Sequence, residues 1–381
     1  MGEPMAGYGE RRWAKSEGVE ETLFARALFL RAGETEVVLI AADVLLVHAE
    51  VARETVRLCA EQGIAEDGIY FTATHTHSGP GGWAPNVIEQ AICGKFDEEA
   101  VGRLARVLAS AVISARGAAE PSQWTWMKLS VPQFVRNRVT NGGVIDPSLD
   151  ALAVRQNDDG ATGVFAIYGA HATCFGASQM KFTADYPGGF VRHLEGGGIA
   201  FAAFGAGAVG SQSYLSSGVD AMSSAGAVGR GLAQPILESL RGAVWRNQVA
   251  LATLRKDVPL PKIQVRLGQK AQLAPWLAST LHPQSAPLHL LRLDEHWLAG
   301  LPIEISAMLS APLRAEALQR GVHLSITSFN GDYVGYVLPP EVFETGHYET
   351  TMSFLGPWGG EYFVDLIRAG TGLDEPAGKT E

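Results

Sequence analysis

The chain has 381 residues, of which 46% are hydrophobic and 18% are charged, enough for one large globular domain or two ordinary ones. Its net charge is −10 and it has no run of lysine or arginine, which argues against a nucleic-acid or anionic-membrane partner. No apolar stretch reaches the ~18 residues of a bilayer span, and the first residues lack the apolar core of a secretory signal. The three cysteines have no close spacing, which argues against a disulfide framework. These features favour a cytoplasmic protein.

The first predicted elements alternate between strand and helix. The β-branched run at 36–43 predicts a buried strand, residues 49–63 predict a helix, and residues 68–74 predict a second strand. This order is typical of a parallel crossover, and polar residues just past the second strand lie where open α/β sheets place their ligand sites. A further helix is expected over 97–117, with Asp97 as its N-cap.

The rest of the chain predicts mostly strands. They are expected at 123–131, 152–171, 199–205, 247–261, 288–304 and, last, 323–333. The stretch 152–171 predicts a hairpin whose second arm ends on His171, and helices are expected at 222–240 and 310–320. Because no repeat, linker or boundary is evident, we expect one α/β domain of mixed β-sheets flanked by helices over residues 1–370. A polar tail is expected at 371–381.

Several predicted strands end on a side chain suited to metal or proton chemistry. These side chains are His75, His77, His171, Glu304, and Tyr333 or Tyr336. Neutral imidazoles and a carboxylate are the usual ligands of a catalytic zinc, which takes three protein ligands and keeps one position open for water. A polar turn that contains histidine by chance is the alternative for the His-Thr-His sequence. The partners at other strand ends favour a metal site.

The sequence THTHSGPGG, from Thr74 to Gly82, resembles the signature of the neutral, non-lysosomal ceramidases, zinc amidases that cut the N-acyl bond of ceramide. Other segments resemble the same family in order, with Glu20-Glu21 in place of the family's His-Asp. These segments are GVEETLFARALFL, RNR followed by DPSLDAL, GAHAT, AGLPIEI and DYVGYVLPPEVFETGHYETTMSFLGPW. The resemblance therefore runs from about Gly18 to Trp358.

The resemblance implies a set of roles. The Zn²⁺ ligands would be His75, His171, Glu304 and Tyr336, with His77 beside the metal. Tyr336 is preferred to Tyr333 because Tyr348, twelve residues on, then falls on the family's second functional tyrosine. The family's essential serine corresponds to Ser213, which either orients the attacking water or is itself the nucleophile.

Two further residues have alternative roles. Asp185 corresponds to a family aspartate that would orient a ligand imidazole, or it is a structural aspartate of a loop. Arg138 would bind a polar head group of the substrate or pair with a carboxylate.

The implied activity is zinc-dependent hydrolysis of the N-acyl amide bond of ceramide, or of a related smaller N-acyl compound, by water that the metal activates. His77 and Tyr348 would donate hydrogen bonds to the oxyanion. The alternatives are a zinc esterase or lactonase on the same scaffold, and a non-catalytic ligand-binding homologue. The expected partner is a small-molecule or lipid-like N-acyl substrate.

The sequence departs from the family pattern in several places. SQSYL at 211–215 replaces the family's Asp-Val-Ser-Pro-Asn, and HATCF from His171 replaces its His-Pro-x-Ser-Met. The family's C-terminal β-sandwich domain and a strand before MAGYG are missing, so we expect a shortened N-terminus. These departures favour a substrate smaller than a two-tailed membrane lipid.

Overall fold

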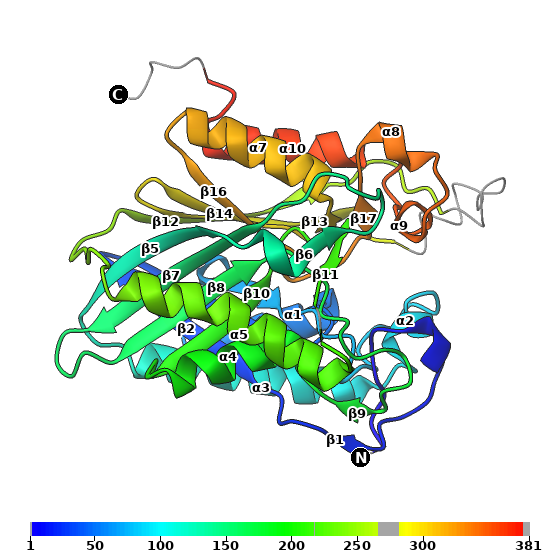
Figure 1. Ribbon diagram of the computed structural model, residues 1–381, viewed down its shortest axis with the longest axis horizontal. Coiled ribbons are helices and arrows are strands. Elements are labelled where there is room, and N and C mark those ends of the chain that lie inside the picture. Colours follow the sequence, from blue (N-terminus) through cyan, green and yellow to red (C-terminus); the bar gives the residue numbers. More distant parts are fainter. Residues whose placement is uncertain (1, 217, 266–281, 376–381) are drawn as a thin grey trace.

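The computed structural model describes residues 2–216, 218–265 and 282–375. Figure 1 shows two layers of β-strands packed face to face, with helices on the outer side of each layer. Two neighbouring sheets form the lower layer in that view, and one sheet forms the upper layer. The expected α/β fold of mixed sheets flanked by helices is confirmed.

The first sheet of the lower layer has the strand order β2-β3-β4. Its strands and helices are β2 (Ala25–Ala32), β3 (Thr35–Ala42), β4 (Ile69–Ala73), α1 (Ala49–Ala60) and α3 (Glu98–Gly117). β2 and β3 are antiparallel, whereas β3 and β4 are parallel and are joined through α1. This confirms the predicted crossover. Asp97 caps α3 as expected, since its side chain accepts a hydrogen bond from the amide of Glu99.

The second sheet of the lower layer has the order β10-β8-β7-β5. Its elements are β5 (Ser122–Ser130), β7 (Ser148–Gln156), β8 (Thr162–Tyr168), β10 (Phe201–Ala206), α4 (Asp185–Gly196) and α5 (Ala221–Leu240). The predicted hairpin is the antiparallel pair of β7 and β8, and β10 runs parallel to β8. Helices α4 and α5 pack on the outer face of this sheet.

The upper layer is a sheet of order β12-β13-β14-β16. Its elements are β12 (Leu251–Pro259), β13 (Ser285–Leu293), β14 (His296–Gly300), β16 (His323–Thr327), α7 (Ala307–Gln319) and α10 (Gly359–Thr371). The first three strands are antiparallel, and β16 is parallel to β14. Figure 1 shows α7 and α10 covering the outer face of this sheet.

Successive side chains of a strand point to opposite faces, and both faces are apolar here because each one packs against a different layer. In β3, Val38 and Ile40 pack towards α1 and α3, whereas Val37 and Leu39 pack into a core between the two strand layers. Phe165 of β8 and Leu291 of β13 lie in the same inter-layer core. Strands buried on both faces read as continuous apolar runs, which is why the sequence shows them clearly.

Short elements surround one end of these layers. They are β1 (Gly18–Val19), β6 (Val135–Asn137), β9 (Lys181–Phe182), β11 (Gln212–Tyr214), β15 (Glu304–Ile305), β17 (Tyr336–Val337), α2 (Gln90–Cys93), α8 (Pro340–Phe343) and α9 (Tyr348–Thr351), with single 3-10 turns at Gly9–Arg11 and Pro132–Phe134. A third 3-10 turn, Glu66–Gly68, directly precedes β4 at the other end. β11 pairs with β6, β15 with β17, and β1 with β9.

Four sequence-based expectations were wrong in detail. β8 ends at Tyr168, so His171 lies in the following loop, and the stretch predicted to end on Glu304 stops at Gly300 because Pro302 interrupts it. The stretch 323–333 is not the last strand, since β17 follows it. Helix α4 was not predicted. Its first residue, Asp185, has a left-handed φ of 59°, which differs from the backbone of an ordinary helix start.

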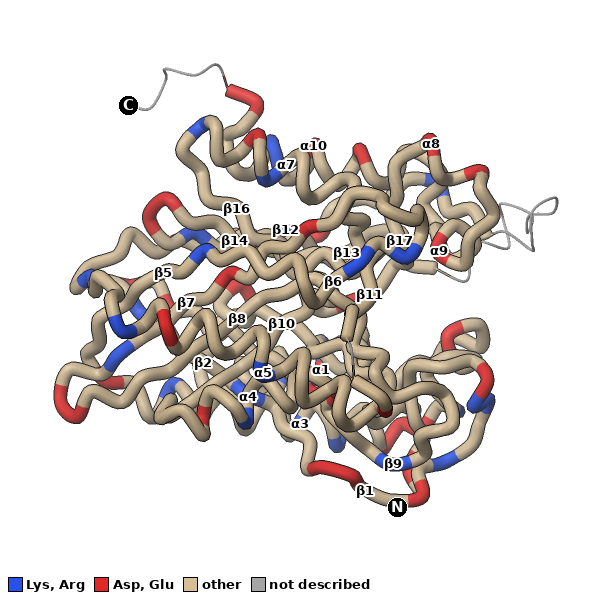
Figure 2. Tube along the Cα trace, viewed as in Figure 1, with Lys and Arg blue, Asp and Glu red and all other residues tan. Residues whose placement is uncertain are grey.

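Helix α10 ends at Thr371, the first residue of the predicted tail. Leu373, two residues past its end, is buried, and residues 376–381 of the predicted tail lie outside the described residues. In Figure 2 residues of both charge signs are interspersed over the helices and turns. Among the helices of the described ranges, none has the length and apolarity that crossing a bilayer requires.

Candidate metal centre

Five polar side chains meet where segments from all three large sheets come together. His75 and His77 follow the end of β4, and His171 follows the end of β8. Glu304 and Tyr336 are Cα partners in the parallel pair of β15 and β17. The lower strand layer therefore contributes the histidines, and segments beside the upper layer contribute Glu304 and Tyr336.

Backbone bridges hold the two histidine segments together. Thr76 is bridged to Ala172, and His171 is bridged to Ser213 of β11. Since each bridge fixes the neighbouring Cα atoms, the imidazoles are placed by backbone pairing as well as by side-chain packing.

The polar atoms at the centre of this cluster are close to one another. The Nε2 atoms of His75 and His77 are 3.2 Å apart. Glu304 Oε2 lies 3.0 Å from His171 Nε2 and 3.6 Å from His75 Nε2. The hydroxyl of Tyr336 lies 3.2 Å from His171 Nε2.

The other ring nitrogen of each histidine points to a backbone carbonyl. The carbonyl groups that face Nδ1 of His75, His77 and His171 belong to Leu45, Gly7 and Gln212, at 2.8, 2.8 and 2.9 Å. A carbonyl only accepts, so each Nδ1 carries the proton and donates it. In the neutral ring, each Nε2 then presents a lone pair to the centre.

These lone pairs face one another without a donor between them. His75 Nε2 and His77 Nε2 are both acceptors at 3.2 Å, and Glu304 Oε2 is a buried oxygen with no hydrogen-bond partner in the described part of the chain. A buried acceptor without a partner is costly, and facing acceptors repel. A cation at the centre removes both costs, so the donor set fits a bound metal ion.

The spacing is compatible with a transition-metal ion such as zinc. Zinc–nitrogen and zinc–oxygen bonds of 2.0–2.2 Å in a tetrahedron separate neighbouring ligand atoms by about 3.3–3.6 Å. The separations of 3.0, 3.2 and 3.6 Å around His171 and His75 are close to this value. The three imidazoles also form a group whose ligand atoms all lie within 4.8 Å of one another.

Burial keeps the imidazoles in the form that binds metal. It lowers the pKa of His75 to about 3, and lowers the pKa of both His77 and His171 well below the usual value. Neutral imidazole is the ligand form, so the cluster needs no deprotonation at neutral pH.

We expect the stability of the metal-free protein to depend on pH through His75. Its pKa is about 3 in the folded state and 6.5 when unperturbed, so its contribution is fully present above pH 6.5 and is lost as the pH falls toward 3. Relative to His75→Gln, the wild type should lose about 1.4 kcal/mol of unfolding free energy per pH unit in this window. Urea unfolding of both chelator-treated proteins between pH 7.5 and 4 measures the difference.

The comparison with His75→Gln cancels the titration of groups that do not interact with His75. His193→Gln, on α4, is the control for replacing a histidine outside the cluster. A constant difference for His75→Gln would contradict a buried neutral imidazole.

A strained backbone positions His75. Its φ is 60°, a left-handed value that costs ~1–3 kcal/mol in a residue other than glycine. Phe329 also has a left-handed φ, of 66°, and its ring stacks on the His75 ring with centroids 4.2 Å apart. Phe329 was not recognised from sequence, where an aromatic residue after a strand gives no distinctive signal.

Two tyrosines lie against the cluster, one beside Glu304 and the other beside His171. Tyr333 donates to Glu304 Oε1 at 2.8 Å, whereas Tyr336 lies on the His171 side of the cluster. Arg138 donates to the Tyr336 hydroxyl at 3.1 Å and forms a 2.6 Å ion pair with Glu349. Arg138 therefore places a positive charge against the Tyr336 phenol and opposes the rise in pKa that burial causes there.

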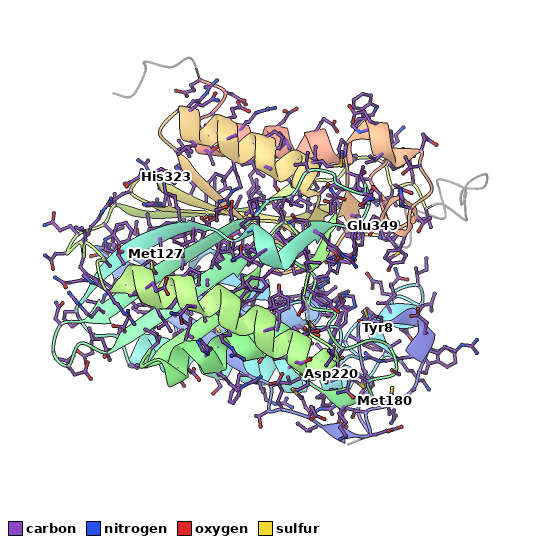
Figure 3. All side chains as sticks on the ribbon, viewed as in Figure 1. Tyr8, Met127, Met180, Asp220, His323 and Glu349 are labelled. Carbon is purple, nitrogen blue, oxygen red and sulfur yellow. The ribbon has the colours of Figure 1, made fainter. Side chains whose placement is uncertain are left out.

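The N-terminal segment holds His77 in place. The Gly7 carbonyl accepts from His77 Nδ1, and the Tyr8 ring packs on His77 with centroids 5.0 Å apart. Arg11, which is buried, donates to the carbonyl of His77 and to Ser78 Oγ. These contacts were not predictable from sequence because they join residues nearly 70 positions apart. In Figure 3, Tyr8 and Glu349 approach this end of the molecule from opposite sides.

The three remaining predicted residues lie at different distances from the cluster. Ser213 is bridged to His171, and its hydroxyl accepts from Arg136 Nε at 3.2 Å. The Tyr348 ring lies 6.1 Å from that of Tyr336, and 57% of its surface is exposed. The structure does not bring Asp185 to the imidazoles.

Asp185 instead holds the loop after His171. Its carboxylate accepts from the amides of Phe175 and Tyr186 at 3.0 and 2.6 Å. The Nδ1 atom that an orienting carboxylate would bind is taken by a carbonyl in each ring of the cluster, so the contacts favour the loop role over the orienting role.

A cavity of about 50 Å³ borders the cluster on one side. His75, His77 and Glu304 line it together with Trp83, which is buried, and Tyr348, which is exposed. A substrate can therefore reach the imidazoles from this cavity.

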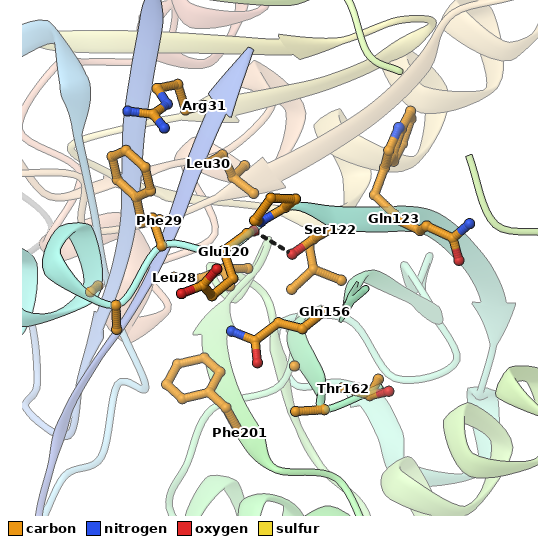
Figure 4. A pocket seen from close by; sticks show the side chains of 18 of the residues that line it. Leu28, Phe29, Leu30, Arg31, Glu120, Ser122, Gln123, Gln156, Thr162 and Phe201 are labelled. Carbon is orange, nitrogen blue, oxygen red and sulfur yellow. Dashed lines mark hydrogen bonds between the residues drawn. The ribbon is translucent and has the colours of Figure 1, made fainter. Parts of the chain in front are cut away.

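A larger groove of about 470 Å³ lies elsewhere (Figure 4). It is lined by residues at the start of β8 and β10, including Thr162 and Phe201, whereas His171 follows the end of β8. Arg31 and Glu120 are its titratable side chains in the described chain, so it lacks the groups for metal or acid–base chemistry.

Comparisons with known proteins agree with this geometry. The family model described as neutral/alkaline non-lysosomal ceramidase, N-terminal, matches residues 1–196, which include all three histidines of the cluster. A search of curated proteins gave no match.

Two solved structures share the fold. One, described as a ceramidase complexed with C2, has a TM-score of 0.84 at 18% identity and covers 100% of this chain and 74% of its own. The other, the neutral ceramidase from Pseudomonas aeruginosa, has a TM-score of 0.82 at 20% identity, over 98% of this chain and 73% of its own. With the match to more than half of the sequence, the chain belongs to the neutral/alkaline non-lysosomal ceramidase family.

Proposed function

We propose that the protein is a zinc-dependent amidohydrolase that cleaves the N-acyl bond of ceramide or of a smaller N-acyl compound. The observation that carries the proposal is the set of facing acceptor atoms of His75, His171 and Glu304, which a bound cation would satisfy. Family membership supports amide hydrolysis as the chemistry.

His75, His171, Glu304 and Tyr336 would hold the zinc ion. When bound, zinc supplies polarisation of the substrate carbonyl and lowers the pKa of water to near 7. The Arg138 guanidinium, which donates to the Tyr336 hydroxyl, stabilises the deprotonated phenol that binds a metal.

The remaining groups act on protons and on the substrate. Because His77 Nδ1 donates to Gly7, its Nε2 is free to accept a proton from the attacking water and to return it to the leaving amine. Tyr348 is exposed beside the cluster and donates to the oxyanion. Ser213, bridged to His171, orients the water or the substrate.

We further propose that residues 1–370 form the catalytic domain and that residues 371–381 take no part in the chemistry. An esterase or lactonase would use the same centre, since zinc activates any acyl carbonyl, and the ligand-binding alternative rests on the altered SQSYL sequence around Ser213.

A paired assay separates these functions. Zinc-replete protein should release fatty acid from a short-chain fluorescent N-acyl sphingosine, lose this activity with a chelator, and regain it when zinc is restored. Hydrolysis of a p-nitrophenyl ester without amide cleavage would favour the esterase, and turnover of neither would contradict an enzyme.

Ser213→Ala tests the role of the serine in the same assay. If Ser213 only orients water or substrate, activity should fall by about 10²–10³ and not to zero, as for loss of one oriented donor. Complete loss at unchanged zinc content would make Ser213 the nucleophile.

A further inference from the structure

The cavity beside the cluster has a second polar wall, opposite the imidazoles. Glu89, His48 and His282 lie in its lining, among apolar neighbours such as Trp83 and Ile92. A wall built only for a hydrocarbon chain would not need a carboxylate and two imidazoles, since burying polar groups is costly.

Glu89 presents a carboxylate that is only partly satisfied. His48 Nδ1 accepts from the Glu50 amide at 3.2 Å, so the proton of the neutral ring lies on Nε2, which is 3.4 Å from Glu89 Oε2. A carboxylate has about four acceptor positions. Within residues 2–216, 218–265 and 282–375, His48 is the one side chain paired with it, so acceptor capacity remains.

His282 is the second polar group without a partner. It is 8% exposed, and neither ring nitrogen has a hydrogen-bond partner among the residues that the structure describes. Its ring packs on Phe354 with centroids 4.5 Å apart, which fixes it in the cavity wall. A buried imidazole with both nitrogens unpaired indicates a polar group that arrives with a ligand.

The volume of the cavity limits the size of the group that a ligand can place there. A water occupies roughly 10–15 Å³ by this measure, so the 50 Å³ here holds only a few small groups. A long acyl or sphingoid chain would therefore continue beyond this space, outside the cavity.

We propose that the cavity selects N-acyl compounds with a short arm that ends in a hydrogen-bond donor, a hydroxyl or an ammonium group. Glu89, oriented by His48, accepts from that donor, and His282 makes the second polar contact. This inference rests on the proposed function and narrows its substrate class.

Short carboxylates test the cavity without requiring turnover. Pentanoate, 4-hydroxybutanoate and 4-aminobutanoate have equal chain lengths and differ only in a methyl, hydroxyl or ammonium end. Their carboxylate binds at the zinc centre, and the chain extends into the adjoining cavity. Isothermal titration of the zinc-loaded protein, repeated with acids up to four atoms longer, compares their affinities.

At the length that reaches Glu89, a donor-bearing acid should bind about 10–100-fold more tightly than the methyl analogue, as expected for a hydrogen bond to a charged group. Glu89→Leu should remove the preference, and Glu89→Gln should keep it for a hydroxyl but not for an ammonium group. His282→Phe keeps the ring packing and should weaken the preference. Glu98→Leu, on the surface of α3, is the control and should leave it unchanged.

Equal affinities at every length, binding of no acid, or a preference that survives Glu89→Leu would overturn the inference. The amide assay is independent of this result. Amide turnover without donor preference would contradict only the inference, whereas donor preference without turnover would contradict the proposed function.

Discussion

Replacing His171 with alanine is expected to reduce the zinc content from about one ion per chain to less than a tenth of that value, and to abolish hydrolysis. His171 Nε2 lies 3.0 Å from Glu304 Oε2 and 3.2 Å from the Tyr336 hydroxyl, so it joins the two halves of the ligand set. Its removal leaves three of the four proposed ligands and takes away the atom that lies next to both Glu304 and Tyr336. Elemental analysis of protein purified without chelator measures the change.

His171 is completely buried, so the alanine variant also leaves a space in the core. His171→Asn is therefore made in parallel, because it keeps a polar side chain of intermediate size while removing the imidazole. His193→Ala is the control and should keep its zinc. Zinc that remains bound in both His171 variants, at full stoichiometry, would contradict the ligand assignment.

The second large effect is expected for Gly7→Ala. Gly7 has a φ of +122°, and a Cβ added there would lie 2.5 Å from the Cα and 2.6 Å from the carbonyl oxygen of His77. The segment must move, and the 2.8 Å bond between His77 Nδ1 and the Gly7 carbonyl is lost with it. Displacement of a catalytic group by about 1 Å costs about 10² in rate, so kcat/KM should fall by this factor.

Gly33→Ala is the matched control for backbone strain. Gly33 also has a positive φ, of +58°, but a Cβ there meets nothing within 4 Å. It should lose a little stability and keep its activity. The zinc content of Gly7→Ala then distinguishes two roles of His77. Unchanged zinc content indicates that His77 lies beside the ion, and loss of zinc indicates that it is a ligand. Unchanged kcat/KM in Gly7→Ala would show that His77 takes no part in the reaction.

The sequence predicted best what depends on regular periodicity. The run at 36–43, the helix after it and the strand before His75 form the predicted parallel crossover, because a strand buried on both faces shows as an apolar run. The five residues of the cluster were also recognised, although Glu304 was expected at the end of a long strand and lies at the start of a two-residue one.

Contacts between distant segments were not predictable. A two-residue strand such as β15 or β17 has no periodicity to detect, and its pairing follows only from the complete fold. The carbonyl groups of Leu45, Gly7 and Gln212, which fix the tautomers, carry no sequence signal because every residue has a carbonyl. Left-handed backbone at His75 and Phe329 likewise reflects what the surrounding structure imposes.

The origin of the ligand atoms has a consequence for how the protein matures. His75 comes from one sheet of the lower layer, His171 from the other, and Glu304 and Tyr336 from the segments that border the upper layer. During synthesis a nascent chain cannot complete the ion's coordination until both layers have docked. An ion bound there would then tie the layers together, and at a free concentration 1,000 times its dissociation constant it would add about 4 kcal/mol of stability. The supply of that ion would therefore affect the lifetime of the folded protein.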